Sequence, residues 1–120
     1  MGVGHHVTTI EAAALSDSLT KITLAGRLDT PGVDKVETRF LAAVVPPARH
    51  VIVDLSGVDF VASMGIRMLV SVARSLTSRR AKIALYGVQP MVGEIFEHVS
   101  LSDIMPVVAT EPEAVAIVTG

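Results

Sequence analysis

The sequence has 120 residues, a mass of 12.6 kDa and a formal net charge of −2. That length suits one compact domain, and residues 1–120 are predicted to form a single domain. Half of the residues are apolar and 18% are charged, which excludes a disordered, charge-driven chain. Ten basic residues face twelve acidic ones, so the chain has no excess of positive charge with which to bind nucleic acid.

The absence of cysteine excludes a disulfide framework, zinc–thiolate sites and thiol catalysis. No apolar run reaches the length of a membrane span, and no secretory signal is recognisable at the start. We therefore expect a cytoplasmic protein that does not insert into membranes. Residues 1–6 are predicted to be a loose N-terminus, and the adjacent His5 and His6 have poor geometry for binding one metal ion. No cofactor and no metal site are predicted.

Hydrophobic periodicity predicts nine elements, in the order strand, strand, helix, strand, helix, strand, helix, strand, helix. Their approximate ranges are residues 7–15, 19–26, 30–45, 51–53, 63–78, 82–86, 90–99, 104–108 and 111–118. Turn residues between the first two strands predict a hairpin. Strands that then alternate with helices predict an α/β fold with right-handed crossovers.

Details of three segments follow from local residue preferences. Thr30 is predicted to cap the first helix, with Pro31 at its first position, where a missing N–H costs nothing. Residues 54–61 are predicted to form a loop containing Gly57. In the third helix, Ile95 and Val99 are predicted to face inward.

Ser63 lies where a buried strand leads through a tight connection into the second helix. One interpretation is that Ser63 caps this helix. Another is that its hydroxyl is presented for modification, since a helix N-terminus favours a phosphate. A hydrolase nucleophile elbow is disfavoured, because Val61 replaces the first glycine of that motif and the chain is too short for the hydrolase fold.

The second helix carries apolar residues on more than one side. If the stripe containing Ile66, Val70 and Ala73 faces the sheet, Met64 and Met68 project toward water. Exposed methionines one turn apart are either part of an adaptable contact surface or ordinary exposed apolar residues.

Three segments of the sequence resemble the STAS domain, the family of bacterial anti-sigma factor antagonists and of the sulfate transporter tail. The segments are Gly26–Asp29, Val53–Ser56 followed by Val58–Phe60, and Ser63–Ile66. The resemblance covers nearly the whole chain. It implies an α/β fold in which a four- to five-stranded mixed sheet packs with about four helices.

The resemblance also implies a switch, from which this sequence departs. STAS antagonists usually carry Asp-Ser-Ser/Thr-Gly at the start of this helix, and a kinase that is also the anti-sigma factor phosphorylates the second hydroxyl residue. The corresponding residues here are Ala62, Ser63, Met64 and Gly65. Met64 has no hydroxyl, so either Ser63 has become the phosphorylated residue or the protein binds without phosphorylation control. We favour the second alternative.

The resemblance therefore implies a non-enzymatic interaction module in bacterial transcription or stress signalling. Its partner is expected to be an anti-sigma factor or a related signalling kinase, and a homodimer is also envisaged. The expected interface residues are Asp29, Asp59, Ala62, Ser63, Met64, Gly65, Arg67 and Met68. Two alternatives remain: a structural subunit of a larger signalling or lipid-transport assembly, and a small-ligand-binding module.

Overall fold

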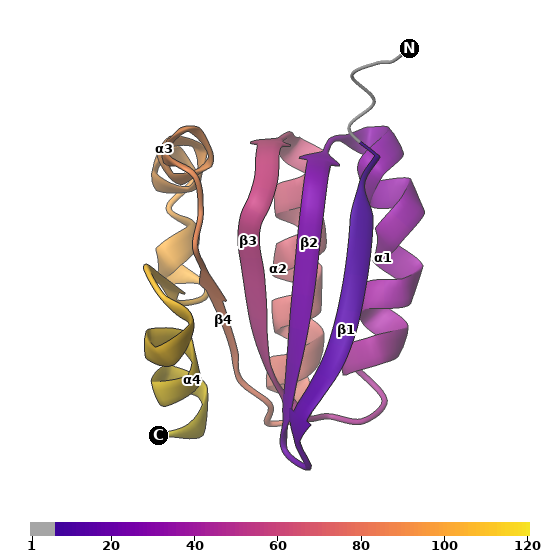
Figure 1. Cartoon of the computed structure of the whole chain (residues 1–120), viewed down its shortest axis with the longest axis vertical. Helices are drawn as coiled ribbons and strands as arrows, with labels where there is room; N and C mark the ends of the chain where they lie inside the picture. Colours follow the sequence, from indigo (N-terminus) through magenta and orange to yellow (C-terminus); the bar gives the residue numbers. More distant parts are fainter. Residues whose placement is uncertain (1–6) are drawn as a thin grey trace.

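The computed structural model describes residues 7–120, which form a five-stranded mixed sheet with helices on both faces (Figure 1). The elements are β1 (Thr9–Ser16), β2 (Leu19–Leu28), α1 (Thr30–Val44), β3 (His50–Val61), α2 (Ser63–Ser78), β4 (Ile83–Tyr86), α3 (Pro90–His98), the 3₁₀ turn η1 (Leu101–Asp103), β5 (Val107–Val108) and α4 (Glu111–Thr119). The predicted α/β fold and hairpin are confirmed.

The strands lie in the order β1-β2-β3-β4-β5. β1 and β2 form the antiparallel hairpin, in which Ala12 pairs with Ile22. The remaining neighbours are parallel, as helical crossovers require. The carboxyl ends of β2 and β3 therefore meet at one end of the sheet, where α1 and α2 begin (Figure 1).

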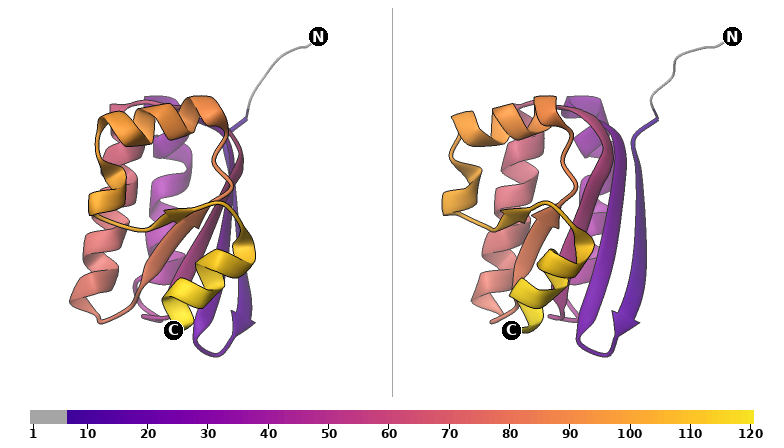
Figure 2. Two further views of the ribbon diagram at one scale, coloured as in Figure 1. Left: turned by 90° about the vertical axis from the view of Figure 1, so that its left-hand side faces the viewer. Right: turned by 60° about the vertical axis from the view of Figure 1, so that its left-hand side comes forward.

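Two apolar clusters hold the layers together. The larger lies between the sheet and the helices α1, α2 and α3, and includes the fully buried side chains of Ile22, Leu24, Phe40 and Leu69. The smaller lies on the opposite face, where Ala114 and Val118 of α4 pack against Ile52 and Ala84. Figure 2 shows α4 on that face beside β4, while the outer part of the β1–β2 hairpin extends beyond this helix.

Two glycines allow helices to approach the end of β2 closely. A Cβ atom at Gly32 of α1 would lie 1.9 Å from the carbonyl oxygen of Arg27, and one at Gly65 of α2 would lie 2.6 Å from that of Leu28. Neither distance is tolerable for a carbon atom, so only glycine fits these positions. The close approach fixes the first turns of both helices against the same strand end.

Three local predictions were wrong. The cap of α1 is Asp29, whose Oδ1 accepts a hydrogen bond from the Gly32 N–H at 2.9 Å, and Thr30 is already helical. Residues 54–61 are not a loop but the second half of β3, with Leu55 and Val58 fully buried. In α3, Val92 and Phe96 face the core, whereas Val99 is 46% exposed.

The expectation about residues 1–6 lies outside the described part of the chain. Within residues 7–120, no helix combines the length and hydropathy needed to cross a bilayer.

Candidate functional site

The predicted site residues gather where β2 and β3 end. The Ala62 N–H donates to the Leu28 carbonyl oxygen at 3.0 Å, which joins the start of α2 to the end of β2. Leu28 pairs with Val61 in the sheet. As a result, Asp29, which precedes α1, and Ser63, which begins α2, follow directly on two paired strands. Residues separated by more than thirty positions in the sequence thus share one end of the domain.

Asp29 is held in place by two hydrogen-bond donors. Its carboxylate accepts hydrogen bonds from the Gly32 N–H at 2.9 Å and from Arg27 Nε at 3.2 Å. The Gly32 N–H, and next the Arg27 guanidinium, hold the pKa of the Asp29 carboxyl below its ordinary value. Arg27 in turn lies over the Phe60 ring, 4.2 Å from the ring centre. The Asp29 carboxylate, which caps α1 and pairs with Arg27, is therefore a fixed negative charge at the strand end next to the start of α2.

Ser63 does not cap α2, which corrects the first interpretation of this residue. The cap is Ala62, which offers no side-chain hydrogen bond, and Ser63 is the first helical residue. The Gly65 and Ile66 N–H groups bond to the Ala62 carbonyl oxygen at 2.9 and 3.2 Å. The Ser63 side chain is exposed, so its hydroxyl is accessible at the helix N-terminus.

The methionines of α2 do not share one environment. Met68 is only 1% exposed and belongs to the core, so its predicted place on the contact surface was wrong. Met64 is half-buried: it packs against the core at the edge of the helix and remains partly accessible. Gly65 is buried against Leu28, so it has a packing role and offers no side chain to a partner.

The exposed side of α2 is amphipathic. Arg67, Ser71 and Arg74 are exposed along it, and Ile66 and Val70 beside them are half-buried. A shallow hollow of about 440 Å³ runs along these residues. The side thus combines positive charge with accessible aliphatic surface, a combination suited to protein contact.

A groove of about 510 Å³ continues this surface from α2 to α3. Its lining is mainly aliphatic, with the Ser63 hydroxyl and the Arg67 guanidinium as polar groups; the lining residues are Val61, Ala62, Ser63, Ile66, Arg67, Ile95 and Val99. The contribution of α3 was not predicted, because Ile95 and Val99 were expected to face inward. Ile95 is instead half-buried and Val99 is exposed. We call the groove and the exposed side of α2 the contact surface.

The remaining predicted residues lie apart from the exposed side of α2. Asp59 is half-buried within β3, four residues before Ser63. Ala62 is half-buried in the groove wall. The structure therefore brings Ala62, Ser63, Met64 and Arg67 together at the start of α2, with Asp29 at the neighbouring strand end.

A separate polar cluster fastens α4 to the other face of the sheet. One carboxylate oxygen of Glu111 accepts hydrogen bonds from Lys21 Nζ at 2.8 Å and from the Tyr86 hydroxyl at 2.9 Å. The Lys21 ammonium lowers the pKa of Glu111, and Glu111 raises the pKa of Lys21. Burial, followed by the Glu111 contact, raises the pKa of Tyr86 to about 12. Because the charges of Lys21 and Glu111 pair with each other inside the cluster, we assign it a structural role.

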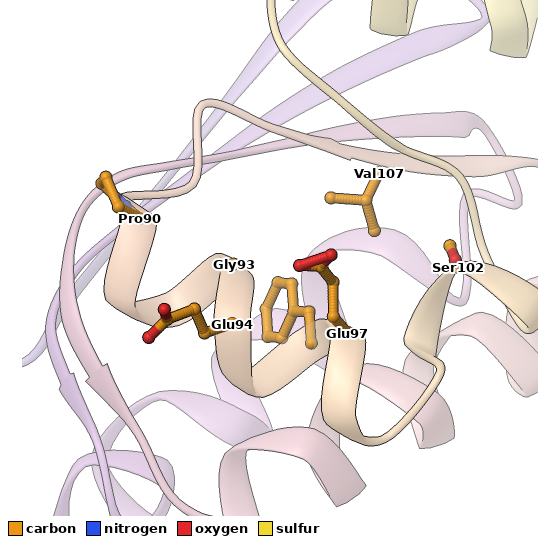
Figure 3. A pocket seen from close by; sticks show the side chains of 7 residues that line it. Pro90, Gly93, Glu94, Glu97, Ser102 and Val107 are labelled. Atoms are coloured by element: carbon orange, nitrogen blue, oxygen red, sulfur yellow. The ribbon is translucent and has the colours of Figure 1, made fainter.

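A second hollow, of about 340 Å³, lies between α3, η1 and β5. Figure 3 shows the Glu97 carboxylate extending over it on the side of Val107, while Glu94 points away. None of the predicted site residues lines it. Among residues 7–120, no three metal-ligating side chains are grouped closely enough to hold an ion.

The comparisons with known proteins agree on one family. The family model described as STAS domain matches residues 11–114. BtrV of Bordetella bronchiseptica, a candidate anti-sigma factor antagonist, is 28% identical over 100 residues, which cover 83% of this chain and 86% of BtrV. The solved structure of an anti-sigma factor antagonist (STAS) domain protein from Planctomyces limnophilus has a TM-score of 0.76 at 26% identity, covering 91% of this chain and 96% of that one.

The Bacillus protein SpoIIAA, an anti-sigma factor antagonist, has been solved in unphosphorylated and phosphorylated forms. Their TM-scores are 0.74 and 0.65, each at 23% identity. The aligned regions cover 93% of this chain and 97% of the unphosphorylated form, and 92% and 99% for the phosphorylated form. At this identity SpoIIAA shows a common fold, and the family assignment rests on the model match. The chain belongs to the STAS domain family.

Proposed function

We propose that the protein is an anti-sigma factor antagonist that binds a kinase-type anti-sigma factor through the contact surface. The names of BtrV and of the Planctomyces protein support this class of function. In this proposal the protein acts in the cytoplasm as a binding module and catalyses no reaction. Capture of the anti-sigma factor leaves the sigma factor free to act.

The observation that carries the proposal is the aliphatic groove beside Ser63 and Arg67. An apolar side chain of the partner can fill a groove of about 510 Å³ between α2 and α3. Arg67, exposed at its rim, can pair with a partner carboxylate once water is excluded around it. The fixed starts of α1 and α2 keep this surface in one geometry, which lowers the entropic cost of binding.

We further propose that binding is independent of phosphorylation. Met64, which the resemblance places at the usual phosphorylated position, has a thioether and no hydroxyl. A phosphate there would add nearly two negative charges to a surface that must be desolvated on binding. A half-buried methionine instead keeps the start of α2, beside the contact surface, neutral and adaptable.

Charge reversal tests the binding proposal. Arg67→Glu should weaken binding to the kinase-type anti-sigma factor of the same organism by about tenfold or more in isothermal titration calorimetry. Arg39→Glu, at an exposed position of α1, is the matched control and should bind like the unmodified protein. Equal affinity of the two variants would refute the contact surface.

Mass spectrometry after incubation with the same kinase and ATP tests the second proposal. We expect no added phosphate and unchanged affinity. If a phosphate is added to the unmodified protein but not to Ser63→Ala, Ser63 is the regulatory residue, and the proposal that binding is independent of phosphorylation is contradicted.

A further inference from the structure

The outer edge of β1 is available for pairing. β1 is the first strand in the sheet order, bonded to β2 on one side only. In both views of Figure 2 the hairpin stands at the margin of the sheet; α1 packs against one face of β1, but no described strand pairs with its outer edge. An edge strand of eight residues presents alternate N–H and C=O groups outward, and these groups can accept another strand.

β1 lacks most features that usually protect such an edge. It contains no proline and no lysine or arginine, and Glu11 is its only charged residue. Seven of its eight residues are exposed, Ile10 being the exception. The irregularity in its pairing with β2 lies at the far end, between Ala14 and Ser16, and leaves the middle of the strand regular. Accessible aliphatic surface flanks this middle, since Val7 is 56% and Leu15 is 46% exposed.

The sequence of β1 is complementary to itself in the antiparallel direction. A two-fold axis perpendicular to the sheet keeps each residue on its own face, so odd-numbered residues pair with odd-numbered ones. An axis through Ala12 places Ala12 opposite its copy, Glu11 opposite Ala13, and Thr9 opposite Leu15. This register keeps the two Glu11 charges from facing each other, and the alanines allow close approach.

The other edge of the sheet is unsuited to the same use. β5 has two residues, Val107 and Val108, and Pro106 directly before it lacks an N–H to donate. Pairing through β1 therefore closes at two copies and does not propagate into a filament.

We propose that two copies of this chain associate through their β1 strands, antiparallel about Ala12, into a continuous ten-stranded sheet. The contact surface lies at the carboxyl ends of β2 and β3, so the two copies present their contact surfaces at opposite ends of the dimer. Each copy can then bind its own partner. The proposal does not depend on the proposed function, because it uses a different part of the fold.

Sedimentation equilibrium of the full chain tests the association. Because a single strand pair is a small interface, concentrations from about 10 μM to about 1 mM should be covered. We expect the mass to rise from that of the 12.6 kDa chain toward twice that value. Ala12→Lys should remain monomeric, because it places two like charges face to face. Ala116→Lys, at an exposed position of α4, is the matched control and should dimerise normally.

Mixing charge variants tests the register. Ala12→Lys and Ala12→Glu should each be monomeric alone, and an equimolar mixture should dimerise, because residue 12 then meets an opposite charge. The chain has no cysteine, so oxidation of Ala12→Cys provides an independent readout: a covalent dimer is expected, with Ala116→Cys as the control. Circular dichroism verifies that each variant is folded. A monomer at every concentration, a dimer insensitive to Ala12→Lys, or a mixture that stays monomeric would overturn the proposal.

Discussion

Alanine at two glycine positions should have opposite effects on stability, because the two sites differ in the space around them. At Gly65 in α2, an added Cβ would lie 2.6 Å from the Leu28 carbonyl oxygen and 2.8 Å from its Cβ. At Gly93 in α3, the nearest atom is Cγ2 of Val88 at 3.6 Å, an ordinary contact distance. Both glycines have ordinary helical backbone, so alanine adds no conformational strain.

The magnitudes follow from two opposing terms. Alanine in place of glycine stabilises a helix by about 0.5–1 kcal/mol. Overpacking against a backbone atom that cannot rotate away costs about 1–3 kcal/mol. Gly65→Ala should therefore lower the free energy of unfolding by about 1–2 kcal/mol, since the clash exceeds the helical gain. Gly93→Ala should raise it by about 0.5–1 kcal/mol, because only the helical gain applies.

Urea denaturation monitored by circular dichroism measures both changes, and equal slopes for all three proteins would confirm that the midpoints are comparable. If Gly65→Ala were as stable as the unmodified protein, the close packing of α2 on β2 would be refuted. The positions of Asp29 and Ser63 at one end of the domain depend on that packing.

Three further predictions test other parts of the structure. The single tyrosine, Tyr86, should ionise with a pKa of about 12 in the folded protein, against an ordinary value of 10.0. The stability that its protonated form contributes below about pH 10 should therefore be lost as the pH rises toward 12. Ultraviolet absorbance of the phenolate measures the pKa, and an ordinary value in the folded protein would contradict this prediction. Because the pKa of Asp29 is lowered in the folded protein, its carboxylate stabilises the fold at pH values above the ordinary pKa of 3.8, and this stabilisation is lost as the pH falls through the folded pKa. Asp29→Ala should therefore reduce the melting temperature more at pH 7 than at pH 2. Equal reductions at the two pH values would argue against the helix cap. Met68→Ala should cost about 2–5 kcal/mol of unfolding free energy in urea denaturation, and half-buried Met64→Ala clearly less; similar costs would mean that the two methionines share one environment.

The sequence predicted the order of elements and the fold class because strong signals agreed at each step. Three signals were clear: a half-buried strand is indicated by the alternation at Ile22 and Leu24, a buried strand by the run Val51–Val53, and the ends of a helix by the prolines around α1. Where local and tertiary effects compete, prediction failed. Ser56 and Gly57 are typical of a turn, yet β3 continues through them because β2 is long enough to pair with it and the core takes up Leu55 and Val58.

The prediction of which side of α2 faces the core was wrong for a different reason. Its apolar residues surround most of the helix, so several stripes fit the helical period. The buried set is Gly65, Met68, Leu69, Val72, Ala73 and Leu76, a regular series at three- and four-residue spacing. The exposed polar series containing Arg67, Ser71 and Arg74 lies opposite and could have fixed the orientation. The groove shared with α3 could not be predicted, because no sequence pattern reports how two helices pack side by side.

Hydrogen exchange of the full chain, with and without the kinase-type anti-sigma factor, tests the contact surface most directly. We expect partner binding to slow amide exchange within residues 62–75 and 92–99 and to leave the exchange of β1 unaffected. Protection confined to other parts of the sheet, with α2 exchanging at its free rate, would contradict the assignment of this surface.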